Sequence, residues 1–206
     1  MYIPTRFLET DRETILNFVE QNSFATLISF DGKKPIATHT PLFIERAEND
    51  QINLVGHIAR ANPQWKTFAA SEEILAVFAG AHAYISPRWY TEPEQNVPTW
   101  NYKSIHAYGK PQTFEEKDEL IEMLRRLIAK YEPNTGYSLE TVSPEIVDKL
   151  VKGIVGFRIV VSRFEAAFKL SQHRPEYHEG VIGGLIENGD ENSLAIARAM
   201  QNLRKD

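Results

Sequence analysis

The alternation of hydrophobic and polar positions predicts a short helix followed by a series of strands. Thr10 and Glu13 have the spacing of a helix capping box, and the apolar positions over residues 15–19 predict an amphipathic helix. Residues 23–30 are apolar and rich in strand-forming types, and Asp31-Gly32 is typical of a hairpin turn. The expected strands lie at residues 23–30, 34–44, 51–58, 73–78, 81–86, 99–108 and 155–168.

Helices are predicted between these strands. Asn62 followed by Pro63 is typical of a helix start, and this helix is expected to run to residue 70. Thr113 and Glu116 have the spacing of a second capping box ahead of a helical pattern. Further helices are expected from residue 144 and from residue 192 or 193. Six or more antiparallel strands with inserted helices predict an α+β chain whose sheet closes into a barrel, because closure removes exposed sheet edges.

Composition narrows the classes of protein that are compatible with this pattern. With 206 residues, of which 42% are hydrophobic and 25% charged, we expect one soluble globular domain. No apolar run is long enough to span a membrane, and the first residues lack the pattern of a signal peptide, so the expected location is the cytoplasm. The absence of cysteine excludes disulfides and thiolate chemistry. A formal net charge of −5 disfavours nucleic-acid binding.

A candidate phosphate site lies where the predicted third strand ends and a helix begins. Arg60 offers a planar set of donors suited to phosphate, and Asn62 caps the helix that follows. The first turn of a helix has unpaired N–H groups and favours an anion. The alternative is an ordinary strand-to-helix junction with a surface arginine.

A second candidate segment is the strand that carries Thr38, His39 and Thr40. Pro41 follows them and cannot donate a ladder hydrogen bond, so this strand is expected to have a free edge or a bulge. Backbone groups at such an edge can contact a planar polar ring. The alternative is a strand end with solvated threonines.

The third candidate segment is rich in aromatic residues. Trp89 and Trp100 occur close to Ser86 and Arg88, a mixture that suits a ligand wall or a subunit interface. The alternative is barrel core combined with dimer packing. The six histidines lack the close helical spacing of a metal site, so no metal is expected. No catalytic dyad and no phosphate-loop or nucleophile-elbow motif is found, so no residue is assigned a catalytic role.

Several of these segments together resemble one known family. The chain is similar to the PaiB-type transcriptional regulators, which are also described as FMN-binding negative regulators. The resemblance extends over nearly the whole chain and depends on the following motifs: Tyr2-Ile3-Pro4 with Phe7, Ala37-Thr38-His39-Thr40-Pro41, Gly56-His57-Ile58-Ala59-Arg60-Ala61-Asn62-Pro63, Tyr84-Ile85-Ser86-Pro87-Arg88-Trp89-Tyr90, Val97-Pro98-Thr99-Trp100-Asn101-Tyr102 and Lys169-Leu170-Ser171-Gln172.

The resemblance implies a six-stranded antiparallel split β-barrel of the FMN-binding type with peripheral helices, related to pyridoxamine-phosphate oxidases. One domain is expected over 1–206, with a barrel part at 1–112, a helical insertion at 113–153, and closing strands with a C-terminal helix at 154–206. Two subunits would form a homodimer with FMN in the groove between them. The implied cofactor-binding residues are Arg60 and Asn62 at the phosphate, Thr38, His39 and Thr40 along the isoalloxazine edge, and Ser86, Arg88, Trp89 and Trp100 around the pocket, from the same or the partner subunit.

The resemblance also implies repression of genes for sporulation and for secreted degradative enzymes. No helix-turn-helix pattern is present, and the acidic charge disfavours DNA contact, so the regulation can be indirect. Three alternatives stay open at this point: an FMN-dependent oxidoreductase that acts on a small substrate, a haem-binding or haem-degrading protein, and a dimeric module that has lost its flavin site.

Overall fold

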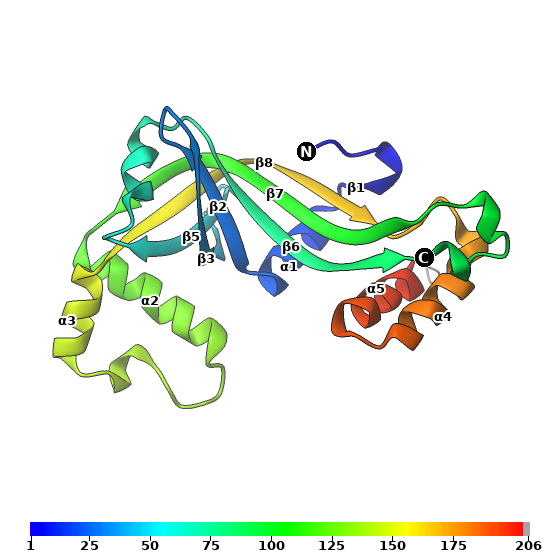
Figure 1. Ribbon diagram of the computed structural model, residues 1–206. Coiled ribbons are helices and arrows are strands. Elements are labelled where there is room, and N and C mark those ends of the chain that lie inside the picture. Colours follow the sequence, from blue (N-terminus) through cyan, green and yellow to red (C-terminus); the bar gives the residue numbers. More distant parts are fainter. Residues whose placement is uncertain (204–206) are drawn as a thin grey trace. The chain divides into compact units, whose positions relative to one another are not determined.

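The computed structural model describes residues 1–203 as a mixed α+β chain (Figure 1). Two compact units are distinguished: unit 1 comprises residues 1–18, 79–106 and the chain from residue 165 onward, and unit 2 comprises residues 19–78 and 107–164. The elements in chain order are η1 (Thr5–Phe7), β1 (Leu8–Glu9), α1 (Arg12–Gln21), β2 (Phe24–Phe30), β3 (Pro35–Pro41), β4 (Phe43–Arg46), β5 (Ile52–Ala59), η2 (Pro63–Ala70), β6 (Ile74–Ile85), η3 (Pro87–Trp89), η4 (Pro93–Gln95), β7 (Thr99–Phe114), α2 (Lys117–Tyr131), η5 (Leu139–Thr141), α3 (Pro144–Lys152), β8 (Ile154–Lys169), η6 (Pro175–Tyr177), α4 (His178–Asn188) and α5 (Glu191–Asn202), where η marks a 3-10 helix.

The strands form an antiparallel sheet in the order β3-β2-β6-β7-β8-β5-β4, with β1 paired to β8. Residues 1–203 therefore form eight strands where the family resemblance implied six, and the ladders among them do not close into a ring. Part of the difference arises at Pro41, where the predicted second strand divides into β3 and β4. Since proline lacks an N–H donor, the β3 ladder ends there.

The predicted hairpin between β2 and β3 is confirmed. Phe30 pairs with Pro35, and the side chain of Asp31 accepts hydrogen bonds from the backbone N–H groups of Lys33 and Lys34, both at 2.8 Å. Gly32 has a φ of 89°, a left-handed conformation that glycine adopts without steric cost. The turn sequence therefore sets the register of this pair.

Two further predictions need correction. Thr113 does not cap a helix, because β7 continues through it to Phe114, and α2 begins only after Glu116. The two strands expected around Gly80 form one continuous strand, β6. Pairing with neighbouring strands determines where each element ends, and this pairing outweighs the local sequence signals.

Unit 2 has an apolar interior to which several strands contribute. Leu27, Leu54 and Phe78 are fully buried, and the ring of Phe68 meets that of Phe157 edge-on with 5.5 Å between centroids. The helices α2 and α3 bury Leu120, Met123 and Val151 against Phe43, Val55 and Phe114. This packing holds the insertion helices beside the end of β5, which leads to Arg60.

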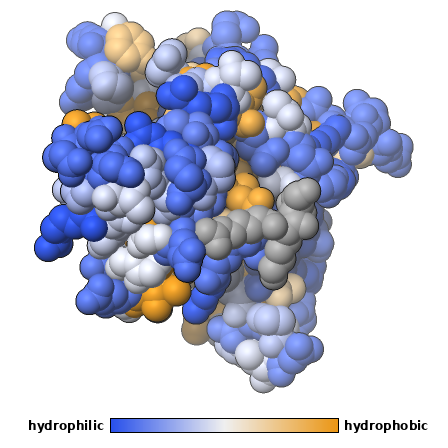
Figure 2. Space-filling view, turned by 90° about the vertical axis from the view of Figure 1, so that its right-hand side faces the viewer, coloured by the Kyte–Doolittle hydropathy of each residue, from blue (hydrophilic) through white to orange (hydrophobic). Residues whose placement is uncertain are grey.

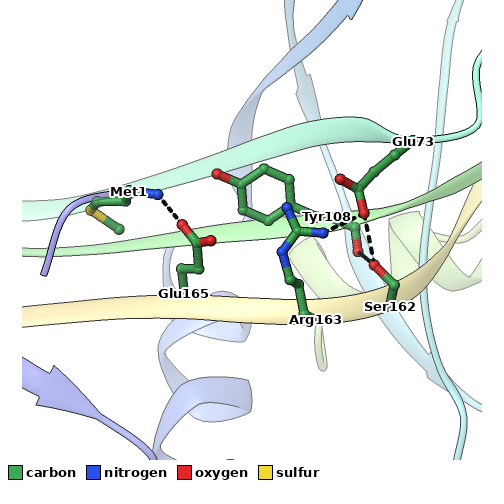
Figure 3. Close-up of polar contacts among 6 residues, drawn as sticks. All are labelled: Met1, Glu73, Tyr108, Ser162, Arg163 and Glu165. Carbon is green, nitrogen blue, oxygen red and sulfur yellow. Dashed lines mark hydrogen bonds and ion pairs between the residues drawn. The ribbon is translucent and has the colours of Figure 1, made fainter.

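A polar cluster links β7, β8 and the residue that precedes β6 in unit 2 (Figure 3). Arg163 on β8 donates a hydrogen bond to Glu73, which precedes β6, at 2.5 Å, and its guanidinium lies 3.8 Å from the ring centroid of Tyr108 on β7. The hydroxyl of Ser162 lies 3.0 Å from the same carboxylate. In unit 1, the N-terminal ammonium of Met1 donates to Glu165 (Figure 3).

Unit 1 contains a helix that the sequence pattern did not predict. Its sequence over α4 contains three glycines, which are poor helix formers, so local propensity argues against it. Packing explains it: a Cβ atom at Gly184 would lie 2.2 Å from the indole of Trp89, and one at Gly180 would lie 2.2 Å from the Trp89 carbonyl oxygen. Only glycine allows α4 to approach Trp89 this closely.

The helices α4 and α5 complete the core of unit 1. They bury Val181, Leu185, Ile196 and Met200 against residues that include Ile85 of β6. The C-terminal helix begins at Glu191, with Asp190 as its cap, slightly earlier than predicted. On the face shown in Figure 2, the surface is mostly hydrophilic, and hydrophobic side chains gather in small separate groups.

Candidate functional site

In unit 2, the side chain of Asn62 joins the start of η2 to strand β3. Its oxygen accepts a hydrogen bond from the backbone N–H of Gln64 at 3.0 Å, and its amide nitrogen donates to the hydroxyl of Thr38 at 2.8 Å. The prediction of Asn62 as a helix cap is therefore confirmed, although the helix is of the 3-10 type. Because the cap occupies the N–H of Gln64 and Pro63 has none, this helix start presents fewer free donors than was expected.

Thr38, His39 and Thr40 do not face one way. Strand alternation places Thr38 and Thr40 on one face and His39 on the other. Thr40 is buried and donates to the backbone carbonyl of His57 at 2.8 Å. His39 is exposed and stacks on Phe24, with 6.1 Å between ring centroids.

The free edge predicted for this strand is confirmed, because β3 is the terminal strand of the described sheet and its ladder partner is β2. Strand β5 also approaches it closely, since a Cβ atom at Gly56 would lie 2.8 Å from the carbonyl oxygen of Pro41. The backbone groups along this edge are therefore near the residues that follow β5.

Arg60 follows β5, and each of its three guanidinium nitrogens donates a hydrogen bond within the chain. Its guanidinium donates to the carbonyl oxygens of Lys152 at 2.9 Å and Ile154 at 3.0 Å, and to the carboxylate of Glu115 at 2.5 Å. The indole N–H of Trp65 donates to the Arg60 carbonyl at 3.0 Å. The arginine is thus held in a fixed position rather than projecting freely into solvent.

Arg60 lines a cavity of about 280 Å³ between β5, α2 and α3 in which most charges are paired. Lys117 and Asp148 form an ion pair at 2.6 Å on the same cavity. Hydrogen bonding to Asp148 raises the pKa of Lys117, and the same bond lowers the pKa of Asp148. Because Glu115 already binds the Arg60 guanidinium, a phosphate group that enters here competes with this carboxylate.

The energetic cost of that replacement is small. The side chains of Arg60 and Glu115 are 40% and 48% exposed, and exposed ion pairs contribute only about 0–1 kcal/mol. A charge-assisted hydrogen bond to a phosphate dianion contributes roughly 1.5–3 kcal/mol. The residues present therefore fit a phosphate, with Glu115 as a competing anion.

The aromatic group predicted around the pocket lies in unit 1. Ser86 is buried, and its hydroxyl accepts from the backbone N–H of Arg88 at 3.3 Å, which caps η3. Trp89 packs against the glycines of α4, as described above. Trp100 is 52% exposed and lies 6.0 Å from the ring of Tyr84, so it offers an accessible aromatic surface.

The structure brings together Thr38 and Asn62 in unit 2, and the predicted residues Ser86, Arg88, Trp89 and Trp100 belong to unit 1. Glu115 was not anticipated as the partner of Arg60, because the two are 55 positions apart and no local pattern links them. Within residues 1–203, no group of three His, Asp or Glu side chains is placed to bind a metal, and no described helix is long and apolar enough to cross a membrane.

Comparison with known proteins identifies the family. The model of the family described as "Putative FMN-binding domain" matches residues 1–163. The chain belongs to this family. It is 44% identical over 208 residues to "Protease synthase and sporulation protein PAI 2" of Bacillus subtilis. The aligned region covers 100% of this chain and 99% of that protein. The predictions of the family and of FMN as its cofactor are confirmed.

Two solved structures share the fold at low sequence identity. The flavocytochrome Anf3 from Azotobacter vinelandii matches 82% of this chain and 72% of its own, with a TM-score of 0.65 and 14% identity. A FAD and heme binding protein from Mycobacterium smegmatis matches 79% of this chain and 73% of its own, with a TM-score of 0.59 and 14% identity. These likenesses establish a common fold.

His57, beside Thr40, gives the stability of the chain a specific pH dependence. Its Nδ1 is buried without a hydrogen-bond partner, and burial lowers the pKa of the imidazole below its usual value of 6.5. The unfolded chain therefore binds the proton more readily, so the free energy of unfolding should fall as pH drops below about 6.5. In His57→Gln we expect a shallower fall, by at most about 1.4 kcal/mol per pH unit.

Urea denaturation between neutral and mildly acidic pH measures this difference. Burial also lowers the pKa of His106, which is present in both proteins, so part of the slope should persist in His57→Gln. If the free energy of unfolding changed with pH to the same extent in the wild type and in His57→Gln, the result would contradict the role given to His57.

Proposed function

We propose that this chain is an FMN-binding, homodimeric split-barrel protein that acts as a negative regulator of sporulation and protease synthesis. The observation that carries the proposal is 44% identity over the full length to a protein named for protease synthesis and sporulation, within a family described as FMN-binding. Such identity over the whole chain makes a shared role more plausible than a shared fold alone. When bound, FMN supplies electron-transfer chemistry, and the protein supplies binding and orientation.

In this proposal, the phosphate of FMN binds at Arg60 near Asn62. The guanidinium is already held in place by two backbone carbonyls, which supports a preorganised site. Glu115 occupies the position of the incoming anion and would be displaced by it. Arg60 would therefore form a charge-assisted hydrogen bond both before FMN binds, with Glu115, and afterwards, with the phosphate.

The isoalloxazine ring would lie along the free edge of β3 near Thr38, where backbone groups can contact its polar atoms. His39 stacks on Phe24 on the opposite face and would contribute to the surroundings of the ring rather than to its edge. Ser86, Arg88, Trp89 and Trp100 of the partner subunit would close the pocket, and Trp100 has the exposed aromatic surface that such a role requires.

The competition between Glu115 and phosphate predicts opposite effects of two substitutions on FMN affinity. Arg60→Ala should weaken binding by roughly 1.5–3 kcal/mol, because a charge-assisted hydrogen bond is lost. Glu115→Gln should strengthen binding by up to about 1 kcal/mol, since an exposed ion pair no longer has to be broken. Titration calorimetry or quenching of flavin fluorescence measures both.

Glu140→Gln serves as a matched control. Glu140 forms a comparable exposed ion pair with Arg125, with 2.6 Å between the two groups, and this pair does not involve Arg60. Its FMN affinity should equal that of the wild type. Unchanged affinity in Arg60→Ala would remove Arg60 from the phosphate site and leave FMN binding itself as a separate question.

The proposed homodimer predicts a mass twice that of the 23.6 kDa chain in sedimentation equilibrium. Phe24 is 68% exposed at the start of β2, which supports its burial by a second subunit. Phe24→Ser should shift the equilibrium toward monomer. Ile146→Ser, at a residue that is 53% exposed on α3, should not. A monomeric wild type would rule out the dimer.

We propose that the regulation is indirect. The net charge is −5, and α2 ends at Tyr131 while α3 begins only at Pro144, a connection too long for a helix-turn-helix. We therefore expect no gel shift of promoter DNA from a sporulation or protease gene, even at low salt. A shift that weakens steeply with added salt would show direct binding and contradict this expectation.

A further inference from the structure

A second cavity, in unit 1, has a lining that differs from that of the Arg60 cavity. It measures about 200 Å³ and lies between η1, the segment after η3 and the end of β8. Three cationic side chains line it: Arg6, Lys169 and Arg174. The aromatic rings of Phe7 and Tyr90, both buried residues, form part of its wall.

The cations of this cavity have neutral partners. Lys169 donates to the hydroxyl of Thr99, and Arg174 donates to the side-chain oxygen of Asn96 at 2.5 Å. Arg6 lies over the ring of Phe7, 5.0 Å from its centroid. In the part of the chain that the structure describes, none of these three cations forms an ion pair with a carboxylate, although Arg60 and Lys117 of the other cavity both do.

These positive charges act on ionisable groups within the cavity. Burial lowers the pKa of Lys169, and the nearby Arg6 lowers it further. Partial burial lowers the pKa of His173 at the same cavity, as do Arg6, Arg174 and Lys169, with a smaller opposing effect from Glu176. Like charges gathered in a partly desolvated space destabilise the empty protein, and a bound anion removes this cost.

The turn that follows Lys169 is held rigidly. Ser171 is a buried non-glycine residue with a φ of 59°, a left-handed conformation that costs energy and is typical of functional sites. Its hydroxyl donates to the side-chain oxygen of buried Asn101 at 3.1 Å, and its carbonyl accepts from buried His178 at 2.9 Å. These bonds fix the positions of Lys169 and Arg174 before any ligand arrives.

From this geometry we propose that the unit 1 cavity binds a small phosphate monoester, with its phosphate among Arg6, Lys169 and Arg174 and its organic part against Phe7 and Tyr90. Three cations that have no carboxylate partner among the described residues match a dianion better than a monoanion. The volume of about 200 Å³ is below the roughly 300–1,000 Å³ that is usual for sites of drug-sized ligands, so the cavity admits a ligand smaller than FMN. None of the residues that line this cavity is among those assigned to the proposed flavin site, so the proposal does not depend on that site.

Titration calorimetry with phenyl phosphate on the full-length protein, with its flavin content measured, tests the proposal. We expect saturable binding of one phenyl phosphate per chain, with inorganic phosphate and benzoate each binding more weakly. Lys169→Gln and Arg174→Gln should each lower the affinity by about tenfold or more, the effect of losing a charge-assisted hydrogen bond. Benzoate binding as tightly as phenyl phosphate would overturn the assignment to a phosphate.

Arg198→Gln is the matched control, because Arg198 is an exposed arginine on α5 in the same unit and is absent from the cavity lining. Its affinity for phenyl phosphate should equal that of the wild type. Thermal melts of all variants show whether they are folded. No saturable binding to the wild type, or equal affinities in folded Lys169→Gln, Arg174→Gln and Arg198→Gln, would overturn the proposal.

Addition of FMN distinguishes the two sites. Phenyl phosphate should bind with the same affinity and stoichiometry in the presence and absence of saturating FMN, and Arg60→Ala should bind it normally. Displacement of phenyl phosphate by FMN would overturn the separate site, whereas failure of FMN to bind at all would contradict only the proposed function.

Discussion

The double hydrogen bonding of Asn62 is the interaction on which the arrangement of the candidate flavin site depends. One side chain caps η2 through its oxygen and joins β3 through its nitrogen. The two elements are separated in sequence by β4 and β5, so no local interaction could hold them together. The buried hydrogen bond from Thr40 to the carbonyl of His57 supports the same approach of β3 to β5. Arg60 lies between His57 and Asn62 in the sequence, and its guanidinium is held by the carbonyl oxygens of Lys152 and Ile154 and by Glu115.

The two cavities differ in how their positive charges are balanced. In unit 2, Arg60 and Lys117 are matched with Glu115 and Asp148 in partly exposed ion pairs. Such pairs contribute little to stability, and an anionic ligand can exchange with their carboxylates at small cost. In unit 1, Arg6, Lys169 and Arg174 are restrained by a hydroxyl, an amide oxygen and aromatic rings. A ligand there would supply the balancing negative charge itself.

Backbone geometry provides the rigidity that both cavities require. The close approach at Gly56 allows β5 to pass beside Pro41, and the glycines of α4 allow that helix to cover Trp89. Ser171 tolerates its left-handed conformation because its hydroxyl and its carbonyl both have buried partners. In each case a conformation unfavourable for an isolated segment is maintained by contacts from segments that are distant in the sequence.

The sequence alone determined features whose causes are local. The Asp31-Gly32 turn, the cap at Asn62 and the amphipathic pattern of α2 each involve residues close together in the chain, so their patterns predict the elements correctly. The family could also be identified, because its motifs recur along most of the chain.

Only the tertiary structure decided the features that depend on distant partners. It extended β7 through Thr113 and formed α4 from a glycine-rich segment. It also paired Arg60 with Glu115 and left Arg6, Lys169 and Arg174 of the unit 1 cavity without carboxylate partners among the described residues. Ladder pairing, packing and charge balance are set by residues tens of positions apart, and a pattern of local spacing carries no information about which of them will meet.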